Sequence, residues 1–595
     1  MARRIAEPAP SMRLEVWKGD AARARLESPG FREQWEQLYS ECPWASVFQG
    51  YAYTSIWYDV YRRFTPLLVG ALDDAGSLRG LLALAVGPDG EPIAAGGRQA
   101  EYQVWLSRPG EGDAFIEAAL QRLAAAYPGR TLTFSYLPPD TPRGWLASRR
   151  GIARWCVLRP VSRGIMDVSE AGAEAGLMNK NNRIKLKRLE RVGPVVYERL
   201  MDPVAIDSLL EEIIPLCDLR QGALHDVLPF RADPLKLPFH RALVRAPGLL
   251  CVSVLRCGDQ IASVQIDADN RGQLAIGFGA LSPSLTRHSP GRLHTLFRAR
   301  DAARQGHRSI DLTPGGAYKD FLASRFDEVY TLHVFLGVRR LASWHAADAA
   351  RRAAKALIIR AGADPTALRE RVDRWKQTVD SAGPGRTPVR ALRALKARLW
   401  ADHEVQLYEF DARTVAGLPP SARMRVDCFA DLVSYRRGLT GFEPRRAFLR
   451  RALSRLERGA HVYTHVEGPD LVSSAWVSTW PEAPYGAGLA SALPPSAALV
   501  HDLAASPALC RPDEWVCLLP QLVRAAAALP GVTRALVAVP SGRRDLREAS
   551  CRLGGTYIGS VFASTRGGRT QWWSAVPQTA WAEPTADVPL AGASS

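Results

Sequence analysis

Runs of apolar residues recur along the chain in one order: two strands joined by a tight turn, a third strand, a helix and a closing strand. The clearest copy predicts strands at 250–256, 260–268 and 274–281, a helix at 291–305, and a strand at 308–312. A Cys-Gly-Asp turn joins the first two strands, and Gly306 stops the helix. This order of elements is typical of an α+β protein.

Two other parts of the chain show the same order, as internal repeats would. The first copy predicts strands at 67–72, 78–86, 101–106 and 132–136 and a helix at 113–126. The third predicts strands at 461–467, 470–479, 497–505 and 534–539 and a helix at 513–528, preceded by a strand at 405–410. We interpret the chain as three related units; chance recurrence within an α+β protein is the alternative.

The second copy has a loop suited to an anion. Its third strand runs into Ser289-Pro290-Gly291, which opens the helix, with Arg287 and Arg292 on either side. The first N–H groups of a helix have no partners within it and therefore bind anions, most often phosphates. Gly291 lets the backbone approach such a group closely. The alternative interpretation is that Pro290-Gly291 only marks the start of the helix.

Length and composition suggest where the chain divides. The 595 residues, 47% of them hydrophobic, are enough for three or four domain-sized units. We expect a leader at 1–30 with one strand at 12–17, a first half at 31–175 and a second half at 176–345. A basic helical connector at 346–400, a C-terminal domain at 401–578 and a disordered tail at 579–595 complete the predicted order.

The net charge of +17 is concentrated in two stretches. Residues 339–398 hold fifteen Lys and Arg against five Asp and Glu, and residues 179–191 form a second basic run. Such stretches attract phosphate-rich partners, namely a nucleotide cofactor, an anionic membrane surface or RNA, although solvated helix faces have the same composition. Aromatic residues are not interleaved with these charges, so sequence-specific nucleic-acid binding is not expected.

Several classes of protein find no support in the sequence. The nine cysteines include no CxxC pair, which argues against a zinc site and for a reducing compartment. The sequence has no long apolar run and no secretory signal, so we expect a soluble, cytoplasmic protein without a metal. GxxxxGK[ST], GxSxG and HExxH motifs are absent, and Gly277-Phe278-Gly279 falls on a strand, where a dinucleotide loop would not.

Three groups of residues resemble a known family. They are Val47-Phe48-Gln49 with Trp57, the basic stretch 181–191, and Ser289-Pro290-Gly291 followed by Gly306, Asp311 and Tyr318-Lys319. Over residues 31–340 the chain resembles the CelD/BcsL-type acetyltransferases of the GNAT superfamily, which are associated with bacterial cellulose and exopolysaccharide biosynthesis. These proteins are in turn similar to the tandem GNAT folds of the Fem-like peptidoglycan-bridge transferases.

The resemblance implies a fold, a reaction and a set of residues. It implies tandem GNAT-like folds with mixed central sheets flanked by helices, acetyl-CoA or another acyl-CoA as donor, and an amine or a sugar hydroxyl as acceptor. The loop residues Arg287, Ser289, Pro290, Gly291 and Arg292 would bind the cofactor, and the strand at 274–281 would offer an N–H to the thioester carbonyl.

Acyl transfer also requires proton donors and acceptors. The resemblance makes Asp311 a candidate base and Tyr318 a candidate proton donor, with His288 as a second base and Lys319 as a contact for substrate. Each residue also has a structural alternative: Asp311 as a cap or ion-pair partner, Tyr318 at the edge of a core, and His288 exposed in a loop. Expected partners are a small-molecule or glycan acceptor and, peripherally, an anionic membrane or a biosynthetic complex.

The other two copies depart from the donor-loop pattern. The third has Arg511 but no glycine, and Asp513 and Glu514 at its helix start would repel a pyrophosphate. The first has only Pro109-Gly110-Glu111-Gly112, which includes an acid. We therefore predict a degenerate C-terminal GNAT-like domain. Two alternative functions remain: a Fem-like transferase using aminoacyl-tRNA, bound by the basic connector, and a non-catalytic scaffold derived from the GNAT fold.

Overall fold

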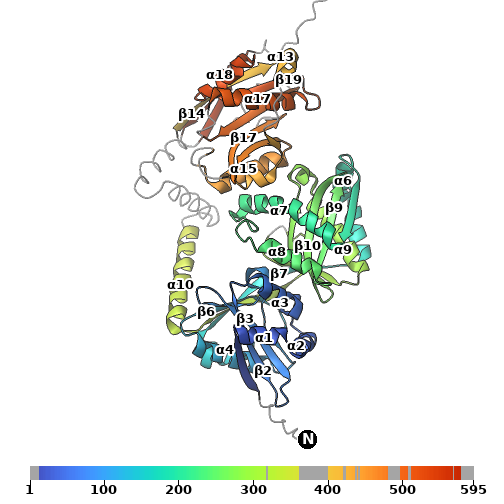
Figure 1. Cartoon of the computed structure of the whole chain (residues 1–595), viewed down its shortest axis with the longest axis vertical. Coiled ribbons are helices and arrows are strands. Elements are labelled where there is room, and N and C mark those ends of the chain that lie inside the picture. Colours follow the sequence, from blue (N-terminus) through green and yellow to red (C-terminus); the bar gives the residue numbers. More distant parts are fainter. Residues whose placement is uncertain are drawn as a thin grey trace, which may run out of the picture. The chain divides into compact units, whose positions relative to one another are not determined.

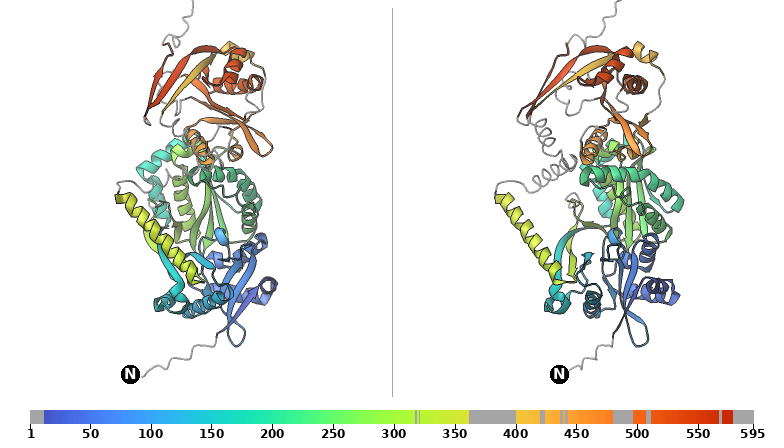
Figure 2. Two further views of the ribbon diagram at one scale, coloured as in Figure 1. Left: turned by 90° about the vertical axis from the view of Figure 1, so that its left-hand side faces the viewer. Right: turned by 60° about the vertical axis from the view of Figure 1, so that its left-hand side comes forward.

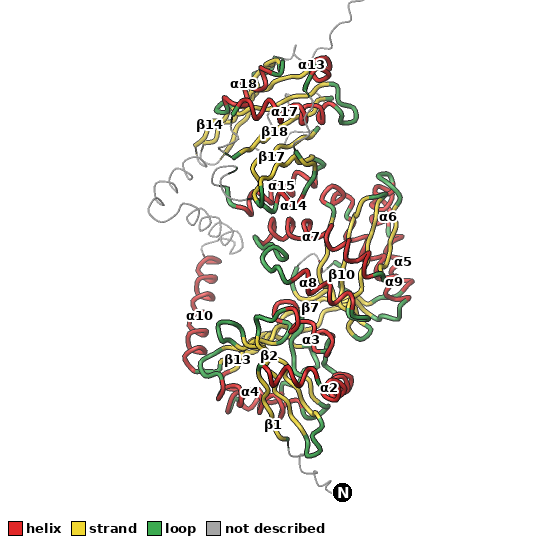
Figure 3. Tube along the Cα trace, in the orientation of Figure 1, coloured by secondary structure: helices red, strands yellow, loops and turns green. Residues whose placement is uncertain are grey.

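The computed structural model describes residues 12–316, 319, 321–360, 400–419, 424–435, 439, 443–479, 496–506, 511–566 and 569–577. The chain forms two compact units. Unit 1 comprises Met1–Ile214 and Pro229–Pro365, and unit 2 comprises Pro215–Leu228 and Thr366–Ser595. Figure 1 follows the elements along the chain, and Figure 3 separates helices from strands.

Unit 1 begins with a mainly antiparallel sheet. Its order is β1-β2-β3-β4, with β5 on β3. The strands are β1 (Arg13–Lys18), β2 (Thr65–Leu72), β3 (Leu78–Val86), β4 (Pro92–Ala94) and β5 (Leu106–Ser107). The helices that accompany them are α1 (Asp20–Glu27), α2 (Pro29–Glu41), α3 (Tyr51–Val60) and α4 (Gly112–Ala126).

The strand predicted at 12–17 is confirmed as β1, which belongs to the first sheet rather than to a separate leader. All of β1 pairs with β2, and the buried Trp17 packs edge-on against Phe31 of α2, with 5.6 Å between ring centroids. A buried indole removes a large apolar area from water, so this contact fastens β1 to the sheet. The chain therefore joins the first half from Arg13 onward.

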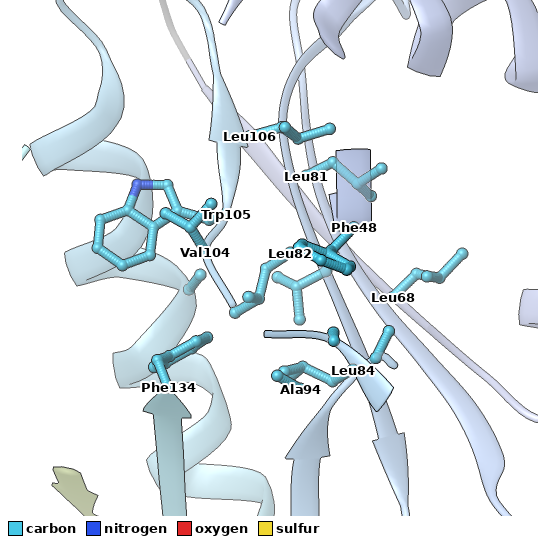
Figure 4. Packing of buried hydrophobic residues seen from close by; sticks show 14 of the residues in the cluster. Phe48, Leu68, Leu81, Leu82, Leu84, Ala94, Val104, Trp105, Leu106 and Phe134 are labelled. Atoms are coloured by element: carbon cyan, nitrogen blue, oxygen red, sulfur yellow. The ribbon is translucent and has the colours of Figure 1, made fainter. Parts of the chain in front are cut away.

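The core of the first half explains a second error. Figure 4 shows Trp105 and Phe134 beside Leu82, Leu84 and their neighbours, and the Trp105 and Phe134 rings meet edge to face at 6.0 Å. A strand was predicted over 101–106, but only Leu106–Ser107 forms one. Residues 102–105 are all buried, and this continuous burial gives an irregular segment the apolar pattern of an inner strand.

The second sheet combines strands from both predicted halves. Its order is β6-β13-β7-β12-β11-β10-β9-β8. The strands are β6 (Thr131–Leu137), β7 (Cys156–Asp167), β8 (Val195–Leu200), β9 (Leu250–Cys257), β10 (Gln260–Asn270), β11 (Gln273–Leu281), β12 (Ser309–Pro314) and β13 (Arg325–Phe335). Because β13 of the second half lies between β6 and β7 of the first half, this sheet joins the two predicted halves.

Helices from residues 170–304 accompany this sheet. They are α5 (Glu170–Met178), α6 (Lys180–Glu190), the part of α7 (Pro203–His225) that precedes Pro215, α8 (Lys236–Arg245) and α9 (Pro290–Arg304). In Figures 1 and 3, α5 and α9 lie side by side, and the ion pairs Arg300–Glu174 and Arg304–Glu170 join them. The strands, the helix and the Gly306 stop predicted for the second copy are confirmed within two residues at each end.

A long basic helix, α10 (Val338–Arg360), follows β13 and is visible as one continuous element in Figure 2. Its buried Asp348 pairs with Arg159 of β7 at 2.5 Å and with Arg352 at 3.1 Å, and Trp344 packs against Phe335. These contacts attach the N-terminal part of α10 to the sheet. The rest of the predicted connector, residues 361–399, lies outside the described residues.

Unit 2 contains a third mixed sheet, ordered β15-β16-β17-β18-β19-β14-β20-β21. The strands are β14 (Trp400–Phe410), β15 (Arg425–Val426), β16 (His461–Glu467), β17 (Asp470–Ser478), β18 (Ala497–Ala505), β19 (Arg534–Pro540), β20 (Thr556–Arg566) and β21 (Arg569–Ser574). The helices are α13 (Ala412–Gly417), α14 (Phe429–Leu432), α15 (Arg445–Glu457), α17 (Pro512–Ala527) and α18 (Arg544–Arg552). The strands and helix predicted for the third copy are confirmed, while the predicted tail at 579–595 lies outside the described residues.

Within the described ranges, no helix has the length and apolar character needed to cross a bilayer. The same residues contain no group of three or more His, Cys, Asp and Glu side chains arranged to hold a metal ion.

Candidate functional site

The centre of the second sheet opens where β11 and β12 part. These parallel strands pair only at Gln273↔Ser309, Leu274↔Ile310 and Ala275↔Asp311, after which β11 continues to Leu281 without β12 as a neighbour. Gly277 and Gly279 lie on this stretch, which still pairs with β10, and both are exposed. Exposed glycines within a strand mark a place where another chain or a ligand can approach the backbone closely.

A bulge bends β11 at the start of this stretch. The pairing with β10 shifts between Ile266 and Asp267, which leaves Gly277 as the extra residue. The Gly277 amide and the Gln265 side chain both donate to the Asp267 carboxylate, and Arg298 of α9 pairs with it at 3.0 Å. Asp267 and Arg298 are 0% and 2% exposed, so a buried ion pair holds the bulge.

The predicted cofactor loop forms one tight corner. The 3₁₀ helix η5 (Pro283–His288) ends at Ser289, which adopts a left-handed conformation with φ 56°, and Pro290 is the first residue of α9. The first turn of α9 contains no acidic residue. Arg287, Ser289, Pro290, Gly291 and Arg292 therefore lie together around a helix N-terminus that attracts negative charge.

Basic helix α6 packs beside this corner. Its Leu189 shares a buried cluster with Leu285 of η5 and Leu293 of α9. Asn182 of α6 accepts a hydrogen bond from Arg292 Nε at 2.9 Å. The basic run noted in the sequence thus supplies cations to the loop, and Arg188 lies close enough to act on His288.

His288 lies in the corner itself. Arg287 Nε donates to its Nε2 at 3.1 Å, and burial together with the charges of Arg287 and Arg188 lowers the pKa of its imidazole. From Ala275, the β11 residue paired with Asp311, to Leu281 the strand spans six residue steps, roughly 20 Å. The structure therefore does not bring His288 and Asp311 into one cluster, and a base role for His288 stays a prediction.

Asp311 lies at the bottom of the parting strands and is fully buried. Its carboxylate accepts hydrogen bonds from the Tyr102 hydroxyl at 2.6 Å, from Arg163 Nη1 at 3.0 Å and from the Thr313 amide at 2.8 Å. Burial raises the pKa of Asp311, and Arg163 and the hydrogen bonds partly offset that rise. Asp311 has the contacts expected of an ion-pair partner, and its predicted catalytic role remains untested.

Tyr318 and Lys319 follow Asp311 in the motif. Tyr318 lies outside the described residues. Lys319 is half-buried, and its Nζ donates to Thr313 Oγ1 at 2.8 Å. Thr313 itself has φ 56°, an unusual conformation for a β-branched residue that often occurs at functional sites. Burial lowers the pKa of Lys319, against the opposing effects of Glu101 and Asp311.

Glu101 is a residue that the sequence did not single out. It is half-buried, and burial raises the pKa of its carboxyl; Lys319 lowers that pKa and Asp311 raises it further. The neighbouring Gln103 fixes this irregular segment to β6, because its amide donates to Ser135 O and its Oε1 accepts from the Ser135 amide, both at 2.9 Å. Polar residues at 101 and 103 within an apolar stretch are the available sequence signal.

The Phe-Gln opening of the motif has a supporting role in this region. Gln49 Nε2 donates to the Tyr102 carbonyl at 2.8 Å, and Gln49 Oε1 accepts from the Ser46 hydroxyl at 2.7 Å. The amide of Val47 donates to Asn270 Oδ1 at 3.0 Å. These bonds join the first half to the hairpin of the second and hold Tyr102 against Asp311.

The corresponding helix starts in the other two copies differ. In the first half, a Cβ on Gly112 would lie 2.7 Å from Pro142, and Glu111 pairs with Arg79, so that helix start is packed against protein. In unit 2, α17 has Asp513 and Glu514 in its first turn. Acids at this position satisfy the helix dipole and repel a phosphate.

These features define the fold class: mixed sheets flanked by helices, with the tandem GNAT-type arrangement that was predicted. A family model described as an acetyltransferase (GNAT) domain matches residues 178–321, the segment that contains β11, α9 and β12. Among curated proteins, none matches the sequence.

Solved structures with similar chains include a tandem GNAT protein from the clavulanic acid biosynthesis pathway, 14% identical, covering 55% of this chain and 99% of its own, with TM-score 0.35. FemX is 9% identical over 51% of this chain and 96% of its own, with TM-score 0.38. The C-terminal domain of a putative lysylphosphatidylglycerol synthetase from Agrobacterium fabrum is 11% identical over 55% and 95%, with TM-score 0.34.

Proposed function

We propose that the protein is an acyl-CoA-dependent acyltransferase that moves an acetyl or other acyl group to an amine or a sugar hydroxyl. One observation carries this proposal: the stretch of β11 beyond its pairing with β12, with exposed Gly277 and Gly279, leads through η5 into the Ser289-Pro290-Gly291 corner at the start of α9. The arrangement combines an accessible backbone with an anion-binding helix start.

The charges of the corner suit the phosphates of coenzyme A. Arg287 and Arg292 flank the helix start, and Arg188 of α6 lies close by. Charge-assisted hydrogen bonds to phosphate are about twice as strong as neutral ones. The acyl-CoA supplies the thioester, and in this proposal the donor lies along β11 with its phosphates at the corner and its thioester near the point where β12 diverges.

We extend this proposal to a biological setting because the chain resembles the CelD/BcsL-type acetyltransferases. In this extension the reaction belongs to bacterial cellulose, exopolysaccharide or envelope biosynthesis in the cytoplasm, with a small-molecule or glycan acceptor. Contact with an anionic membrane or a biosynthetic complex belongs to the same extension.

Isothermal calorimetry with acetyl-CoA tests the donor site. We expect the parent to bind and Gly291→Glu to lose binding, since this change adds a negative charge at the helix start. Gln305→Glu adds the same charge at the exposed far end of α9 and is the matched control, expected to bind like the parent.

Two results would contradict the proposal. They are no binding by the parent up to millimolar acetyl-CoA, and equal binding by parent and Gly291→Glu. In the first case, salt-sensitive binding of tRNA would favour an aminoacyl-tRNA-dependent transferase. If the protein binds neither acetyl-CoA nor tRNA, the result would favour a non-catalytic scaffold derived from the GNAT fold.

A further inference from the structure

The outer face of α6 is a row of basic side chains. Lys180, Arg183, Lys187 and the C-cap residue Arg191 follow one another at spacings of three or four residues, so they lie along one side of the helix. All four are exposed. Leu189, on the opposite side of α6, is buried with residues of η5 and α9. We call the four exposed cations the α6 row.

The α6 row forms no ion pairs within the described part of the protein, and none of its four side chains makes a hydrogen bond there. The other long basic helix of unit 1 differs, because on α10 Arg340 pairs with Glu91 and Arg352 pairs with Asp348. Like charges three or four residues apart on a helix repel each other. The α6 row therefore costs stability unless an anion outside the chain neutralises it.

Exposed apolar side chains accompany the α6 row. Met178 precedes α6, Ile184 lies within the row and Val192 follows it, and these residues are 58%, 40% and 48% exposed. Val196 on β8, the edge strand of its sheet, is 53% exposed. Cations mixed with large exposed apolar side chains are typical of a surface that lies on an anionic bilayer, since the cations meet headgroup phosphates and the apolar groups enter the acyl boundary.

A nucleic acid carries the same charge as an anionic bilayer, but the side chains of this surface suit it less well. Residues 178–196 contain six Lys and Arg, one acid and no aromatic side chain that would stack on a base. Met178, Ile184 and Val192 gain nothing beside a phosphate backbone, whereas a bilayer removes them from water. The charges fit both partners, and the apolar residues favour the bilayer.

We propose that the outer face of α6, with Met178 and Val192 at its ends, is the surface by which the protein docks on an anionic membrane. The inference rests on the membrane contact included in the proposed function and gives that contact a location. On the inner face of α6, Asn182 accepts from Arg292 and Leu189 packs with the η5–α9 corner. Docking therefore places the donor corner about one helix diameter, roughly 10 Å, from the bilayer surface.

Sedimentation of the full chain with lipid vesicles tests this surface, with no acetyl-CoA present. Vesicles of phosphatidylcholine mixed with phosphatidylglycerol supply the anionic surface, and vesicles of phosphatidylcholine alone are the neutral reference. We expect the protein to bind the anionic vesicles and not the neutral ones. Binding should weaken as the salt concentration rises, because salt screens exposed charges.

Two double variants separate the charges from the apolar contacts. Arg183→Gln with Lys187→Gln should weaken vesicle binding roughly 30-fold, because each basic residue at an anionic surface contributes roughly a factor of five. Met178→Gln with Ile184→Gln keeps every charge and should weaken binding roughly tenfold, because less apolar area leaves water.

The matched control is Arg122→Gln with Arg150→Gln, which removes two exposed cations elsewhere in unit 1 and should leave vesicle binding as in the parent. Because every changed position is exposed, all three double variants should melt at the temperature of the parent. The melting temperature thus separates lost docking from lost folding.

The proposal is overturned if the parent does not bind anionic vesicles at low salt, or if either α6 double variant binds them like the parent. Titration with tRNA tests the other partner: tighter binding to tRNA than to vesicles, lost in Arg183→Gln with Lys187→Gln, would assign the α6 row to a nucleic acid and overturn the membrane proposal. A parent that binds vesicles but not acetyl-CoA would contradict the proposed acyltransferase instead, so separate measurements of the two ligands distinguish the two failures.

Discussion

The β11–α9–β12 region of unit 1 and the β18–α17–β19 region of unit 2 have the same order of elements but differ in the groups that matter for a donor. In each, an antiparallel hairpin leads to a bulged strand, a helix and a parallel strand. The parallel strands pair at three positions in unit 1 and at four in unit 2 before they part. Backbone architecture alone does not distinguish the two regions.

The side chains at the bulge distinguish them. In β11 the extra residue is Gly277, whereas the corresponding irregularity of β18 contains Asp502, with φ 47°. The Asp502 carboxylate pairs with Arg455 of α15 at 2.5 Å and with Arg451 at 3.5 Å. Both bulges thus lie beside an ion-paired carboxylate: in β11 it is Asp267 of the neighbouring strand β10, which accepts from the Gly277 amide, and in β18 it is Asp502 of the bulged strand itself.

The helices that follow the two bulged strands, α9 and α17, also differ in the charge at their starts. The first turn of α9 has no acid, and that of α17 has Asp513 and Glu514. The comparison teaches that the same order of strands and helices forms with different charges at its bulge and helix start. This supports the proposal that the C-terminal domain is degenerate, and the following predictions test the contrast.

The largest effect is expected at the buried pair that holds the β11 bulge. Asp267→Leu leaves Arg298 buried without its carboxylate and should cost about 3–5 kcal/mol in local stability. Hydrogen exchange of β10 and β11 amides, read by mass spectrometry, measures the loss within a chain of several domains. Asp267→Leu combined with Arg298→Met should restore most of the protection, and a double variant as unstable as the single one would contradict this account.

Charge reversal at the two helix starts should affect acetyl-CoA binding unequally. Arg292→Glu removes a cation from the α9 corner and adds an acid, so affinity should fall by about 1.5–3 kcal/mol, roughly 10- to 150-fold. Asp513→Lys makes the opposite change in α17 and should neither weaken nor add binding. Isothermal calorimetry of both variants with acetyl-CoA measures these affinities. A second binding event in Asp513→Lys would show that the acidic charge alone prevents donor binding by the third copy.

Acid should weaken the C-terminal bulge through Asp502. Burial raises the pKa of this carboxyl, but Arg455 and Arg451 outweigh burial and lower it to about 2, below its ordinary 3.8. A lowered folded-state pKa stabilises the protein above pH about 4, and this stability is lost as the pH falls toward about 2. Because Asp502 is partly exposed, we expect a loss of about 1–2 kcal/mol. Calorimetric unfolding of Asp502→Asn should show a shallower decline with acid than the parent, and parallel declines would exclude Asp502 as the cause.

The smallest effect is expected for a single methyl group at the donor corner. A Cβ on Gly291 would lie 3.0 Å from Leu281 Cδ2, the end of a flexible side chain. Gly291→Ala should therefore change thermal stability by less than about 1 kcal/mol and reduce acetyl-CoA affinity less than tenfold. Asp513→Ala in α17, which removes a favourable charge at a helix start, should cost about 0.3–1 kcal/mol without changing binding. A large loss of stability in Gly291→Ala would mean that Leu281 cannot move.

The predicted elements succeeded where local patterns were sufficient. The hairpin β9–β10, the strand β11 and the helix α9 follow from apolar runs bounded by Gly258 and Gly306, both of which have positive φ. Prediction failed at residues 101–106, where burial from several sides imitates a strand; the strand predicted at 12–17 formed as β1, but its place in the first sheet was not predicted. The insertion of β13 between β6 and β7 depends on pairing between distant segments, which periodicity does not encode.

The candidate site likewise has one part that the local sequence predicts and another that only tertiary contacts create. The loop residues 287–292 are consecutive in the chain, and their residue types predict an anion site without reference to the rest of the fold. Glu101, Arg163 and Lys319 are far apart in sequence, and only the packing of the two halves brings them to Asp311. The Tyr318-Lys319 motif indicated Lys319, but no local motif indicated Glu101 or Arg163, because long-range contacts set their partners.

The sequence by itself determined the repeated elements, the basic helix α6 and the corner at residues 287–292, because each depends on turn chemistry, periodicity and charges within some twenty residues. The tertiary structure alone decided which strands share a sheet, that Asp311 is enclosed by Tyr102 and Arg163, and that Glu101 lies beside Lys319. The physical reason is that burial and electrostatic partners arise from chain segments that meet only on folding, and these two quantities set the protonation and the reach of every group in the site.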